Sequence, residues 1–304
     1  MTIQERLKNL EYLNQKFVPA KLINEIVELC ASGCPVELID QNCSLDIHFI
    51  IHRLINYSRR PEVEREVFEA IRKYYYNHLK INENKCLVIS DTHIGRLMPH
   101  ESEIPLPTGI NENEKGLMNA YQFALDNNIH TVLHVGDLIE GQSNKKAKRY
   151  LFTTDQKNYL NRVYPNIEGI RTLLLYGNHD INSVHNDRIC GKIIENSPQI
   201  ELIGASYSYV NFNGNIIKLS HPVDNYKYEN IYLNSDLELA GHSHMSAINE
   251  PLRKMKLPAL GSTLEGDIGF IELIDEGNEY LLKEYDDNAS YKRELTIKKR
   301  NHVI

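Results

Sequence analysis

The sequence predicts an α/β domain that follows a small, all-helical N-terminal domain. Up to about residue 80, apolar residues recur at helical spacing, with almost no strand-like alternation. From Cys86 onward, short apolar runs alternate with longer amphipathic stretches, as strands and helices do in an α/β protein. A polar connector near residues 81–85 separates the two parts. We therefore expect residues 1–82 and 83–304 to form separate domains.

Composition and length fit an ordinary globular protein. The chain of 304 residues can hold a catalytic domain and an accessory piece, and 41% of it is hydrophobic. Five scattered cysteines do not suggest a disulfide framework. No apolar run is long enough for a membrane span, and the N-terminus lacks the pattern of a secretion signal. We expect a cytoplasmic protein that has no membrane partner.

The net charge of -7 argues against a protein that coats nucleic acid by bulk electrostatics. Two local basic stretches nevertheless occur. We interpret the one near the C-terminus as a frayed tail, and leave the other open between a solvated loop and a nucleic-acid contact. The stretch near the C-terminus comprises Lys292, Arg293, Lys298, Lys299 and Arg300. The other stretch comprises Lys145, Lys146, Lys148 and Arg149.

Within the N-terminal domain, residues 26–57 have the rhythm of three short helices, with a break at Gly33 and an N-cap at Ser44 or Asp46. This segment resembles the helix-turn-helix units of resolvases and small repressors. Such a unit would contact DNA through Arg53, Arg59 and Arg60. Basic and acidic residues balance over this domain, however, and a DNA reader is usually more basic. A module that forms homo-oligomers or docks a partner therefore stays open.

The second domain is expected to contain helices, hairpins and several buried strands. Helical spacing predicts helices at 115–127 and 155–163. The Asn213-Gly214 dipeptide predicts a tight hairpin between strands 207–212 and 215–220. A second hairpin is predicted from strands 268–274 and 279–285. Four more apolar runs are interpreted as buried strands, at 88–90, 132–135, 173–176 and 237–240.

Every polar cluster of this domain stands at the end of an apolar run. Ligands in open α/β sheets bind outside the carboxyl ends of the strands, so these clusters are expected to share one crevice. Glycines within them suit places where the backbone turns sharply. The clusters are Asp91-Thr92-His93, Gly136-Asp137, Gly177-Asn178-His179-Asp180, His221 and Gly241-His242-Ser243-His244.

The side chains in these clusters are typical of a divalent metal site. Carboxylate, imidazole and amide ligands without thiolate favour manganese, iron, zinc or nickel over a purely soft metal. Residues two apart in an extended segment point to the same side, which applies to Asp91 with His93 and to His242 with His244. The sequence therefore predicts a metal centre at the strand ends.

In this order, the clusters resemble the signature of the calcineurin-like metallophosphoesterases, over roughly residues 86–285. The resemblance implies an α/β/β/α sandwich and a hydrolase that attacks a phosphate ester with metal-activated water. It implies two divalent ions, with manganese expected and iron, zinc or nickel as alternatives. Asp91, His93 and His244 would hold the first ion, Asn178, His221 and His242 the second, and Asp137 both. His179 would assist the leaving oxygen, and Asp180 would orient its ring.

Two departures narrow the implied function. Protein phosphatases of this family have G-D-x-x-D-R-G and G-N-H-E, whereas residues 136–141 here are G-D-L-I-E-G and the third cluster ends in Asp180. The chain resembles instead the phosphodiesterase and nuclease branch, whose substrates are nucleic acids or nucleotides. The capping domain of the repair nucleases is not expected. Two alternatives stay open, namely a phosphomonoesterase for a small metabolite and a DNA-binding regulator whose phosphoesterase domain is a sensor.

The remaining histidines favour structural interpretations. His130 and His134 flank a predicted strand and are expected to be core or edge residues. His48 and His52, with Cys30, Cys34 and Cys43, match no common zinc spacing.

Overall fold

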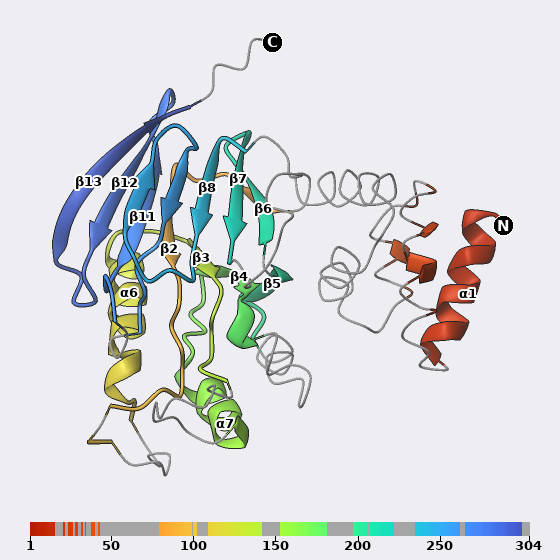
Figure 1. The fold of residues 1–304 in the computed structure, drawn as a ribbon, viewed down its shortest axis with the longest axis horizontal. Helices are drawn as coiled ribbons and strands as arrows, with labels where there is room; N and C mark the ends of the chain where they lie inside the picture. The colour runs from red at the N-terminus through yellow and green to blue at the C-terminus, as the bar shows by residue number, and fades with distance from the viewer. Residues whose placement is uncertain are drawn as a thin grey trace. The chain divides into compact units, whose positions relative to one another are not determined.

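The protein is described here as a computed structural model, and Figure 1 shows its fold. The chain divides into two compact units, residues 1–80 with 209–211 and residues 81–208 with 212–304. The structure describes residues 1–15, scattered positions between 21 and 42, 79–98, 100–101, 109–141, 153–180, 197–205, 207–221, 235–261 and 265–299.

The N-terminal unit begins with helix α1 (Ile3–Gln15). Its start is a capping box, in which the Glu5 amide donates to the Thr2 hydroxyl and the Thr2 amide donates to the Glu5 carboxylate. Arg6 pairs with Glu25 at 3.2 Å, and Leu10 is among the buried apolar residues of this unit. The expected helix-turn-helix contacts of Arg53, Arg59 and Arg60 lie outside the described residues.

The larger unit is built on strands that form one hydrogen-bonded path. Their order is β13-β12-β11-β2-β3-β4-β5-β6-β7-β8-β10-β9. Strands β2 to β5 are parallel, whereas β11, β12 and β13 extend the sheet in antiparallel fashion. The first sheet comprises β2 (Lys85–Ile89), β3 (Thr131–Val135), β4 (Arg171–Tyr176), β5 (Ile200–Ala205), β11 (Phe270–Asp275), β12 (Glu279–Tyr285) and β13 (Tyr291–Lys298).

The path continues into a second sheet after β5. Among the described residues, β5 and β6 pair at one position, between Ala205 and Tyr207. Strands β7, β8 and β10 are parallel neighbours, and β9 closes the edge. This sheet comprises β6 (Tyr207–Phe212), β7 (Asn215–Ser220), β8 (Leu237–Ala240), β9 (Ala247–Asn249) and β10 (Lys254–Lys256), while the short β1 (Lys80–Ile81) stands at the boundary between the units along the chain.

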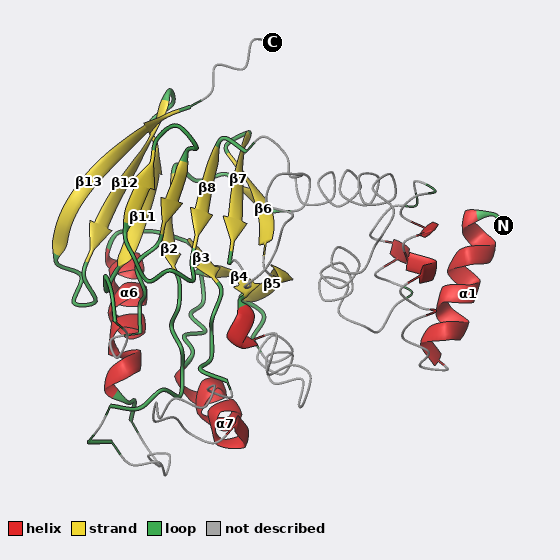
Figure 2. Cartoon of the chain, in the orientation of Figure 1, coloured by secondary structure: helices red, strands yellow, loops and turns green. Residues whose placement is uncertain are grey.

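Two described helices cover one face of the first sheet (Figure 2). A 3-10 turn, η1 (Glu112–Glu114), leads into α6 (Lys115–Asp126), and α7 is Thr153–Val163. The apolar stripe of α6 packs with that of α7 onto residues of β2, β3 and β4, because its side chains recur at helical spacing. These helices contribute Leu117, Ala120, Tyr121, Ala124, Tyr159, Leu160 and Val163 to the core.

The predicted α/β class is confirmed, with two sheets and helices packed on the first. Asn213 and Gly214 have φ values of 49° and 86°, as a two-residue hairpin turn with two left-handed positions requires. The second predicted hairpin corresponds to β11 and β12. Strands β1, β5, β9, β10 and β13 were not predicted. Among the described residues, no helix combines the length and apolar character that a membrane crossing requires.

The interpretation of the C-terminal basic stretch as a frayed tail is wrong. Residues of this stretch form β13, which pairs along β12 from Lys298 to Tyr291. Lys299 then forms an ion pair with Asp275 of β11. Most side chains of β13 are exposed because it is an edge strand, so the sequence lacks the apolar alternation that identifies a strand.

We expect Gly269→Ala to destabilise the protein more than Gly277→Ala. Both glycines have positive φ, at 149° and 82°, so alanine is strained at each. An added Cβ would overlap the Tyr285 carbonyl oxygen at position 269 but would meet nothing within 4 Å at position 277. The expected loss in the free energy of unfolding is about 3 kcal/mol or more for Gly269→Ala and about 1–2 kcal/mol for Gly277→Ala. Urea unfolding measures both, and equal losses would contradict the predicted overlap.

Candidate metal centre

The carboxyl ends of five strands carry the predicted ligands into one place. Strands β2, β3 and β4 of the first sheet and β7 and β8 of the second end at the same side, and each is followed by one polar cluster. Three groups of side chains lie close enough together to hold a metal ion. They are Asp91, His93 and His244; His93, Asp137 and His179; and Asp137, His221 and His242.

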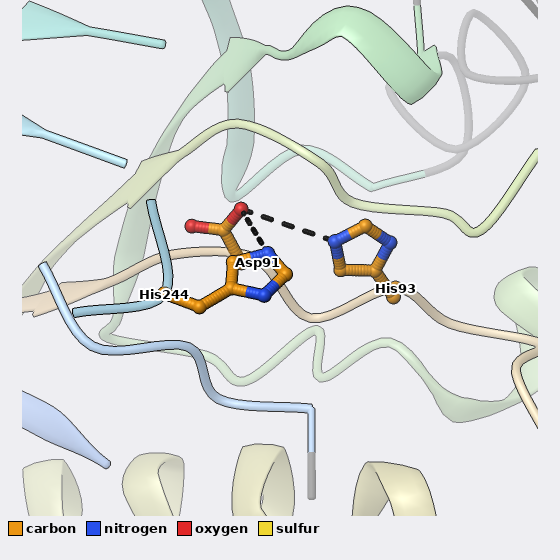
Figure 3. A group of neighbouring side chains, drawn as sticks. All are labelled: Asp91, His93 and His244. Atoms are coloured by element: carbon orange, nitrogen blue, oxygen red, sulfur yellow. Dashed lines mark ion pairs between the residues drawn. The ribbon is translucent and has the colours of Figure 1, made fainter. Parts of the chain in front are cut away.

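The first group surrounds the carboxylate of Asp91. His244 Nε2 lies 3.2 Å from Asp91 Oδ1, and His93 Nε2 lies 3.9 Å from the same oxygen (Figure 3). Asp91 is fully buried, and its carboxylate also accepts hydrogen bonds from the His242 amide and the Ser90 hydroxyl. These contacts fix the carboxylate between two imidazole rings.

The carboxylate of Asp137 is shared between two histidines. Its Oδ2 lies 3.5 Å from His93 Nε2 and 3.2 Å from His221 Nε2. His242 belongs to the same group as Asp137 and His221, and its Nδ1 lies 3.0 Å from Asn178 Oδ1. All seven predicted metal ligands are therefore brought together, with Asp137 between the two sets.

Two imidazoles are oriented so that one particular nitrogen faces the cluster. The carbonyl oxygen of Val135 can only accept, so His221 Nδ1 donates to it at 2.8 Å. His93 Nδ1 lies 2.9 Å from the Glu140 carboxylate. The Nε2 atoms of both rings are buried without a hydrogen-bond partner among the described residues. A metal ion fits here, because histidine ligands usually anchor their second nitrogen in this way.

The electrostatics of the cluster also suit a cation. Burial alone would lower the pKa of His93 and His221, but the neighbouring carboxylates raise these values to about 10 and about 9. Burial would raise the pKa of Asp137, yet the charges of His221 and His93 hold it far below its ordinary value. The carboxylates thus demand positive charge beside them, which bound metal would supply in place of protons.

The backbone is strained where the ligands stand. Positive φ values occur at Asp91 (52°), His93 (43°), Asp137 (51°), His242 (74°) and His244 (49°). Non-glycine residues rarely adopt such values, and they cluster at functional sites because the surroundings must enforce them. Five of the seven predicted ligands therefore stand in the left-handed region of backbone conformation.

The neighbouring glycines mainly provide room. Gly136 does have positive φ, at 83°, as expected for a sharp turn. Gly177 and Gly241 do not, but an added Cβ would overlap Asp137 Oδ1 at Gly177 and Ser90 Oγ at Gly241. The requirement for glycine at positions 177 and 241 is therefore explained by the close approach of neighbouring atoms rather than by a sharp turn.

His179 lies beside the cluster in a partly exposed position. Its amide donates to Asp137 Oδ1 at 2.9 Å, and its Nδ1 donates to the Glu140 carbonyl oxygen at 2.6 Å. The carboxylate of Asp180 accepts hydrogen bonds from the amides of Gly177, Leu138 and Ile139. Asp180 thus joins the two ligand loops, while the Glu140 carbonyl oxygen contacts the His179 ring. The expected orientation of the His179 ring by Asp180 stays a prediction.

Sequence reasoning missed two supporting residues. Glu140, 1% exposed, binds His93 through its carboxylate and His179 through its carbonyl oxygen. Its only sequence signal is its place in G-D-L-I-E-G, where it is part of the departure from the protein-phosphatase pattern. Asn113 of η1 donates to the carbonyl oxygens of Thr92 and His93, and no motif indicated this contact.

His130 and His134 belong to none of the three candidate ligand groups. His134 is fully buried, and its Nδ1 lies 2.8 Å from the hydroxyl of Tyr164. Burial lowers the pKa of His134 to about 3, so it stays neutral as a core residue. His130 is exposed and contacts the Gly169 carbonyl oxygen. Of the alternative zinc residues, Cys30, Cys43, His48 and His52 lie outside the described residues.

The sequence profile of calcineurin-like phosphoesterases matches residues 85–258. No curated protein matches the chain in sequence. Similar solved structures include a phosphoesterase from E. coli, with 14% identity, 70% of this chain and 100% of that chain covered, and a TM-score of 0.41. A dimetal phosphatase from Danio rerio has 10% identity, coverages of 71% and 99%, and a TM-score of 0.40. A nuclease from Pseudomonas putida has 15% identity, coverages of 62% and 83%, and a TM-score of 0.34. At such low identities and TM-scores, these similarities do not indicate the substrate of this chain.

We expect Asp137→Asn to lower the amount of bound divalent metal, because it removes the charge of the carboxylate shared by both ligand sets. Asp236→Asn is the matched control, since Asp236 is as deeply buried but lies at the opposite end of β8. Elemental analysis of both variants after loading with Mn²⁺ measures the effect. Equal metal content in Asp137→Asn and in the parent would contradict the geometry.

Proposed function

The chain belongs to the calcineurin-like phosphoesterase family, and from this premise we propose that it is a two-metal phosphodiesterase or nuclease acting on a nucleic acid or nucleotide. The observation that carries the proposal is the position of Asp137. Its Oδ2 lies within 3.5 Å of imidazole nitrogens from both ligand sets. A carboxylate in this position suits two neighbouring ions better than one.

In this proposal each ion has ligands of its own and shares one carboxylate with the other ion. Asp91, His93 and His244 would hold one ion, Asn178, His221 and His242 would hold the other, and Asp137 would contribute to both sites. Manganese is the expected metal, with iron, zinc or nickel as alternatives for the same ligand types. When bound, two such ions acidify a water molecule and neutralise the phosphate oxygens of the substrate.

His179 is proposed to deliver a proton to the leaving oxygen. Its Nδ1 donates to the Glu140 carbonyl oxygen, so Nε2 is the nitrogen that exchanges a proton with substrate. The amide of His179 is bonded to Asp137, which fixes the distance between this ring and the ligand groups. Glu140 thus sets the orientation of both His93 and His179.

A diester is favoured over a monoester by charge. A monoester carries an additional negative charge, which arginine recognises well through paired donors. The protein-phosphatase pattern places an arginine directly after its second acidic residue, whereas this chain has Gly141 after Glu140. Arg96 approaches Glu140 at 3.8 Å, but its side chain is only 9% exposed. The chain thus lacks the arginine that the protein-phosphatase pattern places at position 141, which supports a diester over a monoester.

The deciding experiment is an activity screen of the Mn²⁺-loaded protein. Substrates would be single-stranded DNA, RNA, cyclic nucleotides, and p-nitrophenyl mono- and diesters. Hydrolysis of diesters that is lost with a chelator and restored by Mn²⁺ supports the proposal. A clear preference for monoesters would identify a phosphomonoesterase, and metal binding without turnover on any substrate would favour a sensor domain.

For His179→Gln we expect turnover to fall by about 10²–10⁴-fold while both ions stay bound. The fall should be smaller for p-nitrophenyl esters, because a good leaving group needs less help from an acid. The exposed His130 provides the control substitution His130→Gln. Steady-state rates and metal content are measured on the same samples. Loss of metal in His179→Gln would instead make His179 a ligand, as its group with His93 and Asp137 allows.

We propose that the N-terminal unit brings the enzyme to DNA, on the sequence pattern alone. Replacing Arg53, Arg59 and Arg60 by alanine in the full chain should weaken duplex DNA binding. Hydrolysis of a small diester should not change, since every proposed ligand lies from Asp91 onward. The slope of the logarithm of the DNA-binding constant against the logarithm of the salt concentration should become less negative by about 0.9 for each phosphate contact removed. If the parent shows no DNA binding and light scattering finds a homo-oligomer, the unit is an assembly module.

A further inference from the structure

The last hairpin of the chain, beyond the region that matches the family, contacts the loop that carries His244. We infer that Arg293 of β13 is a positioning residue for the proposed metal ligand His244, so that the C-terminal strand belongs to the metal centre. This inference rests on the proposed function, because it presumes that His244 binds metal.

The loop after β8 needs support from outside. His242 and His244 have φ values of 74° and 49°, which a loop left to itself would abandon. The His244 carbonyl oxygen accepts a hydrogen bond from the Asp267 amide at 2.8 Å. The Asp267 carboxylate in turn accepts from the Ser246 amide at 2.6 Å. The segment around Asp267 therefore holds the loop on one side of His244, and Ser246 is the next anchor point.

Arg293 holds Ser246 from the other side. Its Nη2 donates to both the carbonyl oxygen and the hydroxyl of Ser246, each at 2.9 Å. Its Nε donates to Glu284 at 2.8 Å, and the Ser246 hydroxyl donates to that carboxylate at 2.5 Å. The Glu284 side chain is only 3% exposed, so the guanidinium is fixed on a rigid partner. The planar guanidinium of Arg293 binds the Glu284 carboxylate and Ser246 at the same time, and it therefore restricts the movement of the loop that carries Ser246.

The register of β13 aims Arg293 at the loop. Glu284 pairs with Arg293 and Tyr285 pairs with Tyr291, which leaves Lys292 as an extra residue in a bulge. Bulges redirect side chains and are frequent near active sites. Here the bulge lets Lys292 and Arg293 both reach Glu284, each at 2.8 Å. Lys292 contacts the carboxylate but has no described bond to Ser246, so it provides a matched control.

The test compares Mn²⁺ affinity of the full-length parent, Arg293→Ala and Lys292→Ala by isothermal titration calorimetry. We expect Arg293→Ala to weaken one of two Mn²⁺ sites by about 10–100-fold, as loss of a residue that orients a ligand does. Lys292→Ala should change it by less than about 3-fold, since the loop keeps its anchor. Arg293→Lys should restore part of the affinity, because lysine can still donate to Ser246.

A second comparison separates positioning from general stabilisation. The double variant Arg293→Ala with His244→Ala should bind Mn²⁺ no more weakly than His244→Ala alone, because both act on the same ion. Losses of Mn²⁺ affinity that add up in the double variant would overturn the inference. Equal losses of Mn²⁺ affinity in Lys292→Ala and Arg293→Ala would overturn it as well. So would a lower unfolding temperature of metal-free Arg293→Ala with unchanged Mn²⁺ affinity. A parent that binds neither Mn²⁺ nor iron, zinc or nickel ions would instead refute the proposed function itself.

Discussion

The attraction between buried carboxylates and a cation is the constraint on which the rest of the structure depends. Asp91 and Asp137 are almost fully buried, and two charges so placed are costly unless positive charge lies close by. The surrounding imidazoles can supply it only as imidazolium, and this explains their raised pKa values. A metal ion relieves the same need while leaving the rings neutral. The loops, glycines and anchoring hydrogen bonds all serve to keep these groups together.

The support of the cluster comes from residues that bind the ligands rather than the metal. Glu140 and Val135 fix which nitrogen of His93 and of His221 faces the centre. Asp180 joins the loops after β3 and β4 through three amides, although burial and the charge of Asp137 raise its pKa to about 7. Asn113 ties the first ligand loop to η1. These contacts position the predicted ligands without being part of the ligand groups.

Sequence reasoning identified the residues that the fold brings together at the strand ends, because each cluster is marked locally by polar residues directly after an apolar run. Their assignment as metal ligands stays a prediction. The Asn213-Gly214 turn was predictable for the same reason, since its left-handed φ values are a property of the dipeptide. The role of Glu140 was not predictable, because it depends on which ring the fold brings to its carboxylate. Strand β13 was missed because an edge strand with charged side chains lacks apolar alternation. The bulge that directs Arg293 depends on pairing with β12, which no local pattern specifies.

The division of the ligands between two sheets gives the metal centre a mechanical consequence. Asp91, Asp137 and Asn178 follow strands of the first sheet, whereas His221 and His242 follow strands of the second. Among the described residues, the path between the sheets is continuous only at Ala205 and Tyr207. Bound ions would therefore act as cross-links at the open end of the sandwich. Partial unfolding in which one sheet separates from the other would require metal release, so amide protons of both sheets would exchange through a common opening whose free energy rises with metal concentration.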